Sequence, residues 1–463
     1  MKQVVGLFCA TLALYANNIN TSDSLSMRQA IEIVKSDNLE LKSAKFDEEL
    51  ASKDIDIANG YNFGSLTLTQ DVARSNDAGN VFGFKLASRE ATFGDFGFNQ
   101  FFDSMNNGSA FTIPGQQTLL TTQPHDLNYP KDQNFFQTKL KYEVALFTGF
   151  KLASYKSIAE SMKKMKTLDK DALVDEKVYQ VKKSYYDMAL LEDALKNLNI
   201  VLKNINTLEN MTKSMIQEGY AKNTDLLEVQ AKKGNVERYI NQMQLNEKLL
   251  YQYLSFLLNK DVNSIEIPSE DVKITSLSDE EILANNLDIK KATTGLSVTE
   301  NMVRAQNAAY YPMVGAFGEI STADDTFLGD ANDHKAYTVG ARLSWNLFNG
   351  GIDDASMQKA KIEQMKTKTQ VELAKKGILL QAAKIKTEIA SLNDDVASLK
   401  KELALANEIY ESYEERYREQ LASMSNVIIK QSEQIEKIVK LEEVKNKRNE
   451  RIFALEKLSN GER

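Results

Sequence analysis

The sequence predicts an α+β protein in which four short strands lead into very long helices, and three observations support this class. The motif Leu-Phe-(Thr/Asn)-Gly occurs twice, beginning at Leu146 and at Leu347. Each copy follows a stretch in which apolar and polar residues alternate, and this period of two is typical of a strand with one apolar face. Each copy also precedes a long segment with heptad-spaced apolar residues, which is the pattern of packed helices.

The composition favours long helices over a loop-rich enzyme. The chain has 463 residues, 26% of them charged, but only 5 Pro and 21 Gly. No proline falls within 131–267 or 313–463, so neither range contains the residue that most strongly breaks a helix. The formal net charge is −8 and the chain has no basic cluster, which argues against nucleic acid as a partner.

Residues 1–16, MKQVVGLFCATLALYA, read as a secretory signal peptide, because a lysine precedes a short apolar run that ends in small residues near Ala16. The run is too short to span a bilayer. Cys9, the only cysteine, lies inside this segment, and the preceding Leu7 and Phe8 do not fit a lipoprotein signal. We therefore expect an exported chain without disulfides; an apolar N-terminal helix of a cytoplasmic protein is the alternative.

The two halves of the chain match each other at constant offsets, which predicts two structural repeats. Leu39 aligns with Leu287 at an offset of 248, whereas the two Leu-Phe-x-Gly motifs, and the turns EGYAKNTDLL and EQLASMSNVI, are 201 residues apart. Because the offset falls by 47, the first half must carry 47 additional residues in the loop between its strands. We expect a first repeat at 17–267, a linker at 268–280 and a second repeat at 281–463.

Each repeat is predicted to contain two strands, a long helix and a returning helix. After an initial helix, the first has strands at about 61–72 and 134–147 around a long outer loop at 73–133, and then helices at 148–217 and 224–259. The second has strands at about 313–321 and 335–348 and a returning helix at 425–458. The apolar seam from Ile385 to Tyr417 has the same phase as the seam from Leu191 to Ile205, as in coiled coils.

Four such strands cannot close by themselves. Their open edges would be tolerated by neither water nor lipid, and outer-membrane barrels begin at about eight strands, so closure would need several chains. Aromatic residues gather where the strands meet the helices, as in the girdle at a membrane interface: Tyr61, Phe63, Phe147, Tyr310, Tyr311, Trp345 and Phe348. A soluble sheet with scattered aromatic residues is the alternative. The strand–helix junctions are predicted at Leu146, Phe147, Gly149, Leu347, Phe348 and Gly350.

On its duplicated junctions, its long seams and its paired turns EGYAKNTDLLEVQAK and EQLASMSNVIIKQSE, the chain resembles the TolC-like outer membrane efflux proteins along nearly its whole mature length. The resemblance implies a homotrimer with a 12-stranded outer-membrane β-barrel, four strands per chain, continued by a long periplasmic α-helical coiled-coil barrel. It also implies a passive exit duct, without enzymatic activity or a cofactor, in a tripartite efflux or type I secretion system. The partners would be a periplasmic adaptor protein and an inner-membrane pump of RND or ABC type. A structural or adhesive outer-membrane protein with a coiled-coil stalk is the alternative.

The resemblance further assigns the two turns to a periplasmic tip that contacts the adaptor and forms a gate. The residues concerned are Gly219, Lys222, Asp225, Tyr417, Gln420, Ser423 and Asn426. Only Asp225 matches a gate carboxylate of the family, and Gln420 stands where the family usually has glycine. We expect a mildly cation-selective mouth that closes mainly by helix packing and hydrogen bonds, with Tyr417 a candidate. The alternative is that Thr224 or Asp225 merely caps the returning helix.

The long outer loop is rich in phenylalanine, and the chain has two histidines. Eight phenylalanines lie between Phe82 and Phe111, which predicts a folded cap at the barrel mouth; a receptor-like contact surface is the alternative. His125 and His334 are the only histidines, and both fall in predicted surface loops without neighbouring ligands. We therefore expect solvated histidines, with no metal site and no catalytic site.

Overall fold

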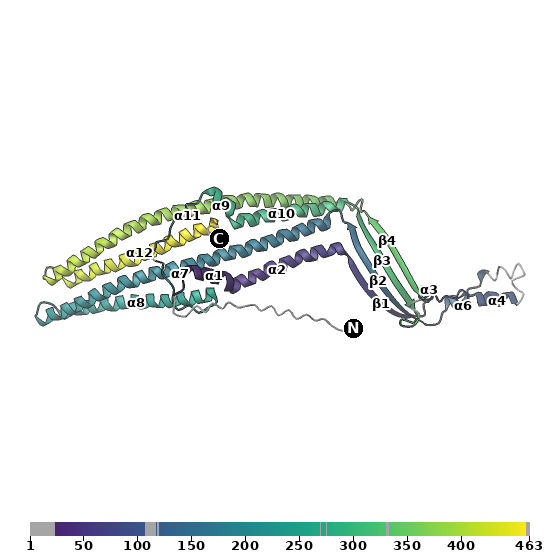
Figure 1. Cartoon of the computed structure of the whole chain (residues 1–463), viewed down its shortest axis with the longest axis horizontal. Coiled ribbons are helices and arrows are strands. Elements are labelled where there is room, and N and C mark those ends of the chain that lie inside the picture. Colours follow the sequence, from purple (N-terminus) through teal and green to yellow (C-terminus); the bar gives the residue numbers. More distant parts are fainter. Residues whose placement is uncertain are drawn as a thin grey trace, which may run out of the picture. The chain divides into compact units, whose positions relative to one another are not determined.

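The computed structural model describes residues 24–106, 117, 120–268, 270–274, 276–329 and 333–459, so the predicted signal peptide lies outside the described residues. The chain forms two compact units, and Figure 1 labels its helices and strands. The first, called here the helical unit, consists of the segment up to Glu48, Met165–Thr293 and the segment from Gln370. The second, called the sheet unit, consists of Glu49–Lys164 and Thr294–Thr369.

The long and returning helices occur as two pairs of equal length. The first pair is α7 (Lys151–Gln217) and α8 (Asn223–Leu258), and the second is α11 (Ile352–Arg418) and α12 (Met424–Ser459). α7 and α11 each have 67 residues, and α8 and α12 each have 36. Each helix of the second pair begins 201 residues after its counterpart, which is the offset of the sequence motifs. None of the described helices combines the length and hydropathy needed to cross a bilayer.

The two helix pairs of the helical unit share one apolar core. Leu198 and Ile205 of α7 are fully buried, and they pack in one cluster with Val229 of α8, Tyr410 of α11 and Ile435 of α12. Leu198 and Ile205 belong to the predicted heptad seam, so the seam faces this core as its period requires. The apolar residues whose heptad spacing predicted the helices therefore also hold these helices together.

A shorter pair of helices precedes each strand pair. These are α1 (Met27–Asp37) with α2 (Leu39–Gly60), and α9 (Asp279–Asn285) with α10 (Leu287–Asn307). A buried asparagine lies at each break. The Asn38 side-chain amide donates to the carbonyl of Leu257 at 2.8 Å, and its oxygen accepts from the N–H of Leu41 at 3.1 Å.

The second asparagine repeats this arrangement. Asn286 donates to the carbonyl of Leu458 at 2.9 Å and accepts from the N–H of Ile289 at 3.0 Å. Both asparagines are 3% exposed. Each one caps the start of a helix and also binds the end of a returning helix, so it ties three elements together with one side chain.

The sheet unit contains one four-stranded antiparallel sheet in the order β1-β2-β3-β4. The strands are β1 (Ser65–Ser75), β2 (Gln133–Phe147), β3 (Met313–Asp324) and β4 (Lys335–Ser344), which confirms the four predicted strands. Two predicted ends are wrong. Tyr61–Phe63 forms a 3-10 helix, η1, after α2, and Trp345–Phe348 lies beyond β4. β4 stops at Ser344 because Ser344 pairs with Met313, the first residue of β3, and no further strand residue is available opposite.

The predicted outer loop between β1 and β2 is folded. It contains α3 (Ala78–Ala87), the 3-10 helix η2 (Phe93–Phe96), α4 (Phe98–Asn106) and α6 (His125–Asn128). Phe84 stacks on Phe135 of β2 with ring centroids 4.2 Å apart, and Phe82 meets Phe96 edge-on at 5.2 Å. The phenylalanines thus pack as a folded cap requires, although Phe111 lies outside the described residues. The position of this cap at a barrel mouth stays a prediction.

The two histidines have different surroundings. The side chain of His125 in α6 is 67% exposed, in agreement with the sequence analysis. The side chain of His334 is only 13% exposed and lies beside Asp324, so the expectation of a solvated loop residue is wrong there. The sequence alone could not show that Arg89 donates to the carbonyl of Lys335, next to His334, and that Glu90 lies close to the histidine.

The turns between the paired helices have the same backbone geometry. The N–H of Tyr220 donates to the carbonyl of Met215 at 2.8 Å, and that of Leu421 donates to the carbonyl of Arg416 at 2.7 Å. Gly219 and Gln420 precede these donors with φ values of 83° and 61°. Both turns are therefore Schellman-type helix ends, in which a residue with positive φ lets the next backbone N–H donate to a carbonyl of the last helical turn. Gln420 adopts the conformation of glycine at some cost in strain.

Replacing Gly219 by alanine should lower the stability of the helical unit by about 1 kcal/mol, because a Cβ disfavours positive φ even where space is open. Gly234 is a matched control, since it lies inside α8, and an added Cβ would meet nothing within 4 Å at either glycine. Gly234→Ala should stabilise the helix by about 0.5–1 kcal/mol. The helical circular dichroism of each purified variant, followed on heating, measures the difference. Shifts of the same sign would contradict the left-handed turn.

Candidate functional site

One face of the sheet is apolar and exposed across all four strands. The register places two rows of residues opposite one another, the first formed by Leu66, Tyr142, Gly318 and Val339 and the second by Leu68, Leu140, Ile320 and Tyr337. Tyr337 is 84% exposed and Val339 is 78% exposed. A continuous exposed apolar face of this kind is suited to lipid and unsuited to water.

The opposite face of the same strands is polar. Lys139 Nζ lies 3.6 Å from Asp71 Oδ2, and Lys141 Nζ lies 2.7 Å from Glu143 Oε1. Successive side chains of a strand point to opposite faces, so these charges alternate with the apolar rows. The sheet can therefore separate an apolar medium from an aqueous one.

The predicted strand–helix junctions turn through left-handed backbone conformations. Gly149 and Phe150 have φ values of 61° and 68°, and Gly350 and Gly351 have values of 70° and 84°. A Cβ on Gly149 would lie 2.8 Å from the carbonyl oxygen of Ala308, whereas one on Gly350 would meet nothing within 4 Å. Gly149 is thus required for two reasons: a Cβ would collide with the carbonyl oxygen of Ala308, and the positive φ disfavours residues that have a Cβ. Exposed apolar side chains surround the junctions at Leu146, Leu347 and Phe348, and Phe147 packs edge-on against Phe150.

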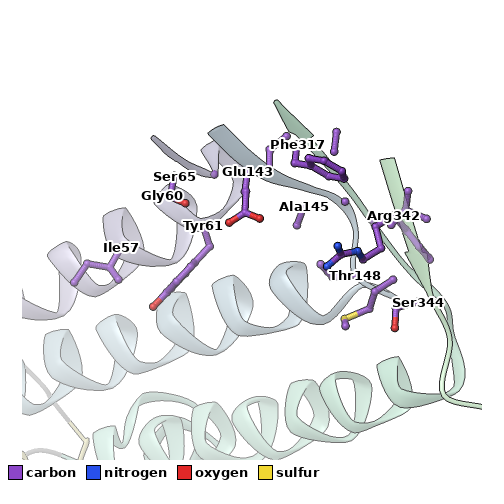
Figure 2. Close-up of a pocket in the computed structure, with 17 residues that line it drawn as sticks. Ile57, Gly60, Tyr61, Ser65, Glu143, Ala145, Thr148, Phe317, Arg342 and Ser344 are labelled. Carbon is purple, nitrogen blue, oxygen red and sulfur yellow. The ribbon is translucent and has the colours of Figure 1, made fainter. Parts of the chain in front are cut away.

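A pocket of about 710 Å³ lies on the polar face where the strands meet the helices. Figure 2 shows Glu143 of β2 and Arg342 of β4 reaching into it, with Tyr61 and Thr148 on the helix side. The guanidinium of Arg342 lies 5.8 Å from the centre of the Phe317 ring. The pocket therefore has acidic, basic and aromatic groups in its wall.

The two helix turns use complementary halves of one capping motif. At the first turn, Asp225 Oδ2 accepts the backbone N–H of Lys222 at 3.1 Å. At the second, Ser423 Oγ accepts the backbone N–H of Asn426 at 3.3 Å. A full capping box has both bonds, so each turn of this chain retains one of them. Asp225 thus has a local structural role at the start of α8, and its part in a gate stays a prediction.

Tyr417 lies near enough to Asp225 to be affected by its charge. Tyr417 is 5% exposed and belongs to the shared apolar core. Burial raises the pKa of the Tyr417 hydroxyl, the Thr212 side chain partly offsets this rise, and the negative charge of Asp225 adds a smaller increase. The phenol is therefore neutral at physiological pH, where it can only act through packing or hydrogen bonding.

One carboxylate at the turns, that of Glu228, was not among the predicted site residues. Ser425 Oγ donates to Glu228 Oε2 at 2.9 Å and so links the first helix pair to the second. Glu228 lies three residues after Asp225, one helical turn further along α8. That spacing was the only signal that could have identified it. The two turns consequently carry more negative charge than Asp225 alone.

Comparisons with known proteins agree with this architecture. Residues 280–456 match the family model described as outer membrane efflux protein. No curated protein matched the chain. Among solved structures, the CusC transmembrane channel has a TM-score of 0.76 at 15% identity, covering 94% of this chain and 91% of that chain.

Two further structures are similar. The outer membrane protein VceC from Vibrio cholerae has a TM-score of 0.74 at 15% identity, covering 94% of this chain and 96% of that one. The MtrE outer membrane channel from Neisseria gonorrhoeae has a TM-score of 0.73 at 14% identity, covering 94% and 89%. Likeness at such identities establishes the fold. The chain thus has the fold of these channels over most of its length, and residues 280–456 carry the sequence pattern of the outer membrane efflux protein family.

Proposed function

We propose that this chain forms the outer-membrane exit duct of a tripartite efflux or type I secretion system. It would conduct cargo passively from an inner-membrane pump and a periplasmic adaptor to the exterior. The observation that carries the proposal is the sheet, which has one apolar face, one charged face and two edges without partner strands among the described residues.

The edges of the sheet support assembly into a closed barrel. β1 and β4 each pair with one neighbour only, so half of the backbone N–H and C=O groups of each edge strand point away from the sheet. In a bilayer these groups must find partners within the protein. Three copies with four strands each would close a 12-stranded barrel, as the family resemblance implies. The apolar rows would then face lipid and the charged face would line the channel.

The helical unit supports the same assembly. α8 carries the exposed apolar side chains of Leu245, Leu249 and Phe256, at 56%, 52% and 67% exposure. Their spacing of four and seven residues places them on one side of the helix. A soluble monomer would leave this stripe in water, whereas a neighbouring chain in a coiled-coil barrel would cover it.

We further propose that the turns at Gly219–Asp225 and Gln420–Asn426 form the periplasmic tip. They are the places where long helices reverse, and their side chains at Lys222 and Ser423 are exposed. An adaptor could therefore contact them without rearrangement of the core. Helix pairs that return twice favour a conduit over an adhesive stalk, which needs no such return.

Val339→Arg should impair assembly in the membrane, because the side chain of Val339 belongs to the apolar face of β4. Arginine on the lipid face of a barrel costs up to about 2–4 kcal/mol, depending on depth. Thr338→Arg is the matched control, since Thr338 points to the polar face opposite Glu319. The measurement is the amount of assembled protein in the outer-membrane fraction. Equal assembly of the two variants would show that the faces are assigned wrongly.

Single cysteines at Lys222 and Ser423 should form cross-links to an adaptor in cells, since the mature chain has no other thiol if the signal peptide is removed. Lys131→Cys is the control, because Lys131 is equally exposed but precedes β2 in the outer connection. Cross-linking with a short bifunctional maleimide, followed by identification of the joined protein, measures the contact. Adaptor cross-links from position 131 alone would reverse the proposed orientation.

Asp225→Asn should lower the cation selectivity of the duct without reducing its thermal stability, because asparagine keeps an oxygen that can accept the N–H of Lys222. Asp225→Ala removes the charge and the cap, so it should also destabilise the turn by about 1 kcal/mol. Reversal potentials in planar bilayers and melting temperatures separate the two effects. If Asp225→Asn leaves the reversal potential and conductance unchanged, Asp225 is a cap and not part of a gate.

A further inference from the structure

A cluster of three ligand-type side chains lies outside every site described above. Glu90 follows α3, Asp324 ends β3, and His334 lies next to the first residue of β4. One ligand atom from each of the three lies within 4.8 Å of the other two. The cluster joins the outer connection between β1 and β2 to the connection between β3 and β4, both within the sheet unit.

Two of the three side chains are largely buried, and one of them has a ring nitrogen without a hydrogen-bond partner among the described residues. The side chains of Asp324 and His334 are 7% and 13% exposed, and His334 Nδ1 lies 3.9 Å from Asp324 Oδ2. Nδ1 is buried and has no hydrogen-bond partner among the described residues. A buried ring nitrogen without a partner is costly for a neutral imidazole, and a metal ion would satisfy it.

The backbone around the cluster is held in place. Arg89 has a φ of 59°, and its guanidinium donates to the carbonyl of Lys335 at 2.6 Å, which docks the segment after α3 against the start of β4. Ser88 Oγ donates to Glu90 Oε2 at 2.6 Å. The β3–β4 connection covers Asp324 so closely that a Cβ on Gly329 would lie 2.5 Å from Asp324 Oδ2. The three ligands therefore occupy defined positions.

We propose that Glu90, Asp324 and His334 bind one divalent transition-metal ion per chain, of the zinc type. One imidazole nitrogen and two carboxylate oxygens suit Zn²⁺, Mn²⁺ or Fe²⁺, whereas Mg²⁺ and Ca²⁺ favour oxygen ligands alone. Tetrahedral ligands at about 2.1 Å from zinc are about 3.4 Å apart, so binding requires a small inward movement of the three groups. The ion would fasten the outer connection to the β3–β4 hairpin.

The test uses the full untagged protein in detergent, treated with a chelator and then titrated with Zn²⁺. The wild type should bind about one ion per chain and melt at a higher temperature when loaded. His334→Ala should abolish saturable binding. Glu90→Gln, which keeps the shape and the hydrogen-bonding capacity of the side chain, should weaken zinc affinity at least tenfold.

His125→Ala is the matched control, because His125 is the other histidine and its side chain is 67% exposed. It should leave the affinity and the stoichiometry unchanged. Titration with Co²⁺ should in addition give visible absorption bands in the wild type and in His125→Ala but not in His334→Ala. Helical circular dichroism checks that each variant is folded. Absence of saturable Zn²⁺ binding to the wild type, or equal binding by a folded His334→Ala variant, would overturn the proposal.

Discussion

The proposed assembly depends on one constraint, which is that the two edges of the sheet are unpaired within the described part of the chain. β1 and β4 lie at the two ends of the order β1-β2-β3-β4, and no other described strand pairs with them. A sheet with one apolar face can enter a bilayer only if its edge groups are paired, so in the proposed duct the chain would pair with copies of itself. The exposed rows of the sheet and the apolar stripe of α8 are explained by the same need. We therefore regard edge pairing between chains as the interaction that makes the proposed duct.

The two halves of the chain meet equivalent structural demands with different residues. The left-handed residue of the turn is Gly219 in one half and Gln420 in the other. The cap after it uses the carboxylate of Asp225 in one half and the hydroxyl of Ser423 in the other. Backbone geometry has thus been kept while charge has diverged, which leaves the two turns chemically distinct on one scaffold. A pump or adaptor could distinguish the two hairpins by that difference.

Periodicity predicted the elements well because it depends on neighbours within one helix or strand. The four strands and the paired helices were predicted in this way, and the returning helices begin within one residue of expectation. Features set by distant residues were not predicted. β4 ends where its partner strand begins, Asn286 binds a carbonyl 172 positions away, and the largely buried His334 lies near Glu90, which follows α3. Both helix turns lie where the sequence predicted them, whereas their role as a site stays a prediction, and the link from Glu228 to Ser425 required the fold.

The most direct measurement of the central claim is the mass of the complex extracted from the outer membrane in mild detergent, determined by native mass spectrometry. The account predicts a single species with the mass of three mature chains, which should persist until the sheet unfolds. In that species the edge amides of β1 and β4 should be as protected from hydrogen exchange as those of β2 and β3. A predominant folded monomer, with edge amides that exchange freely, would contradict the account.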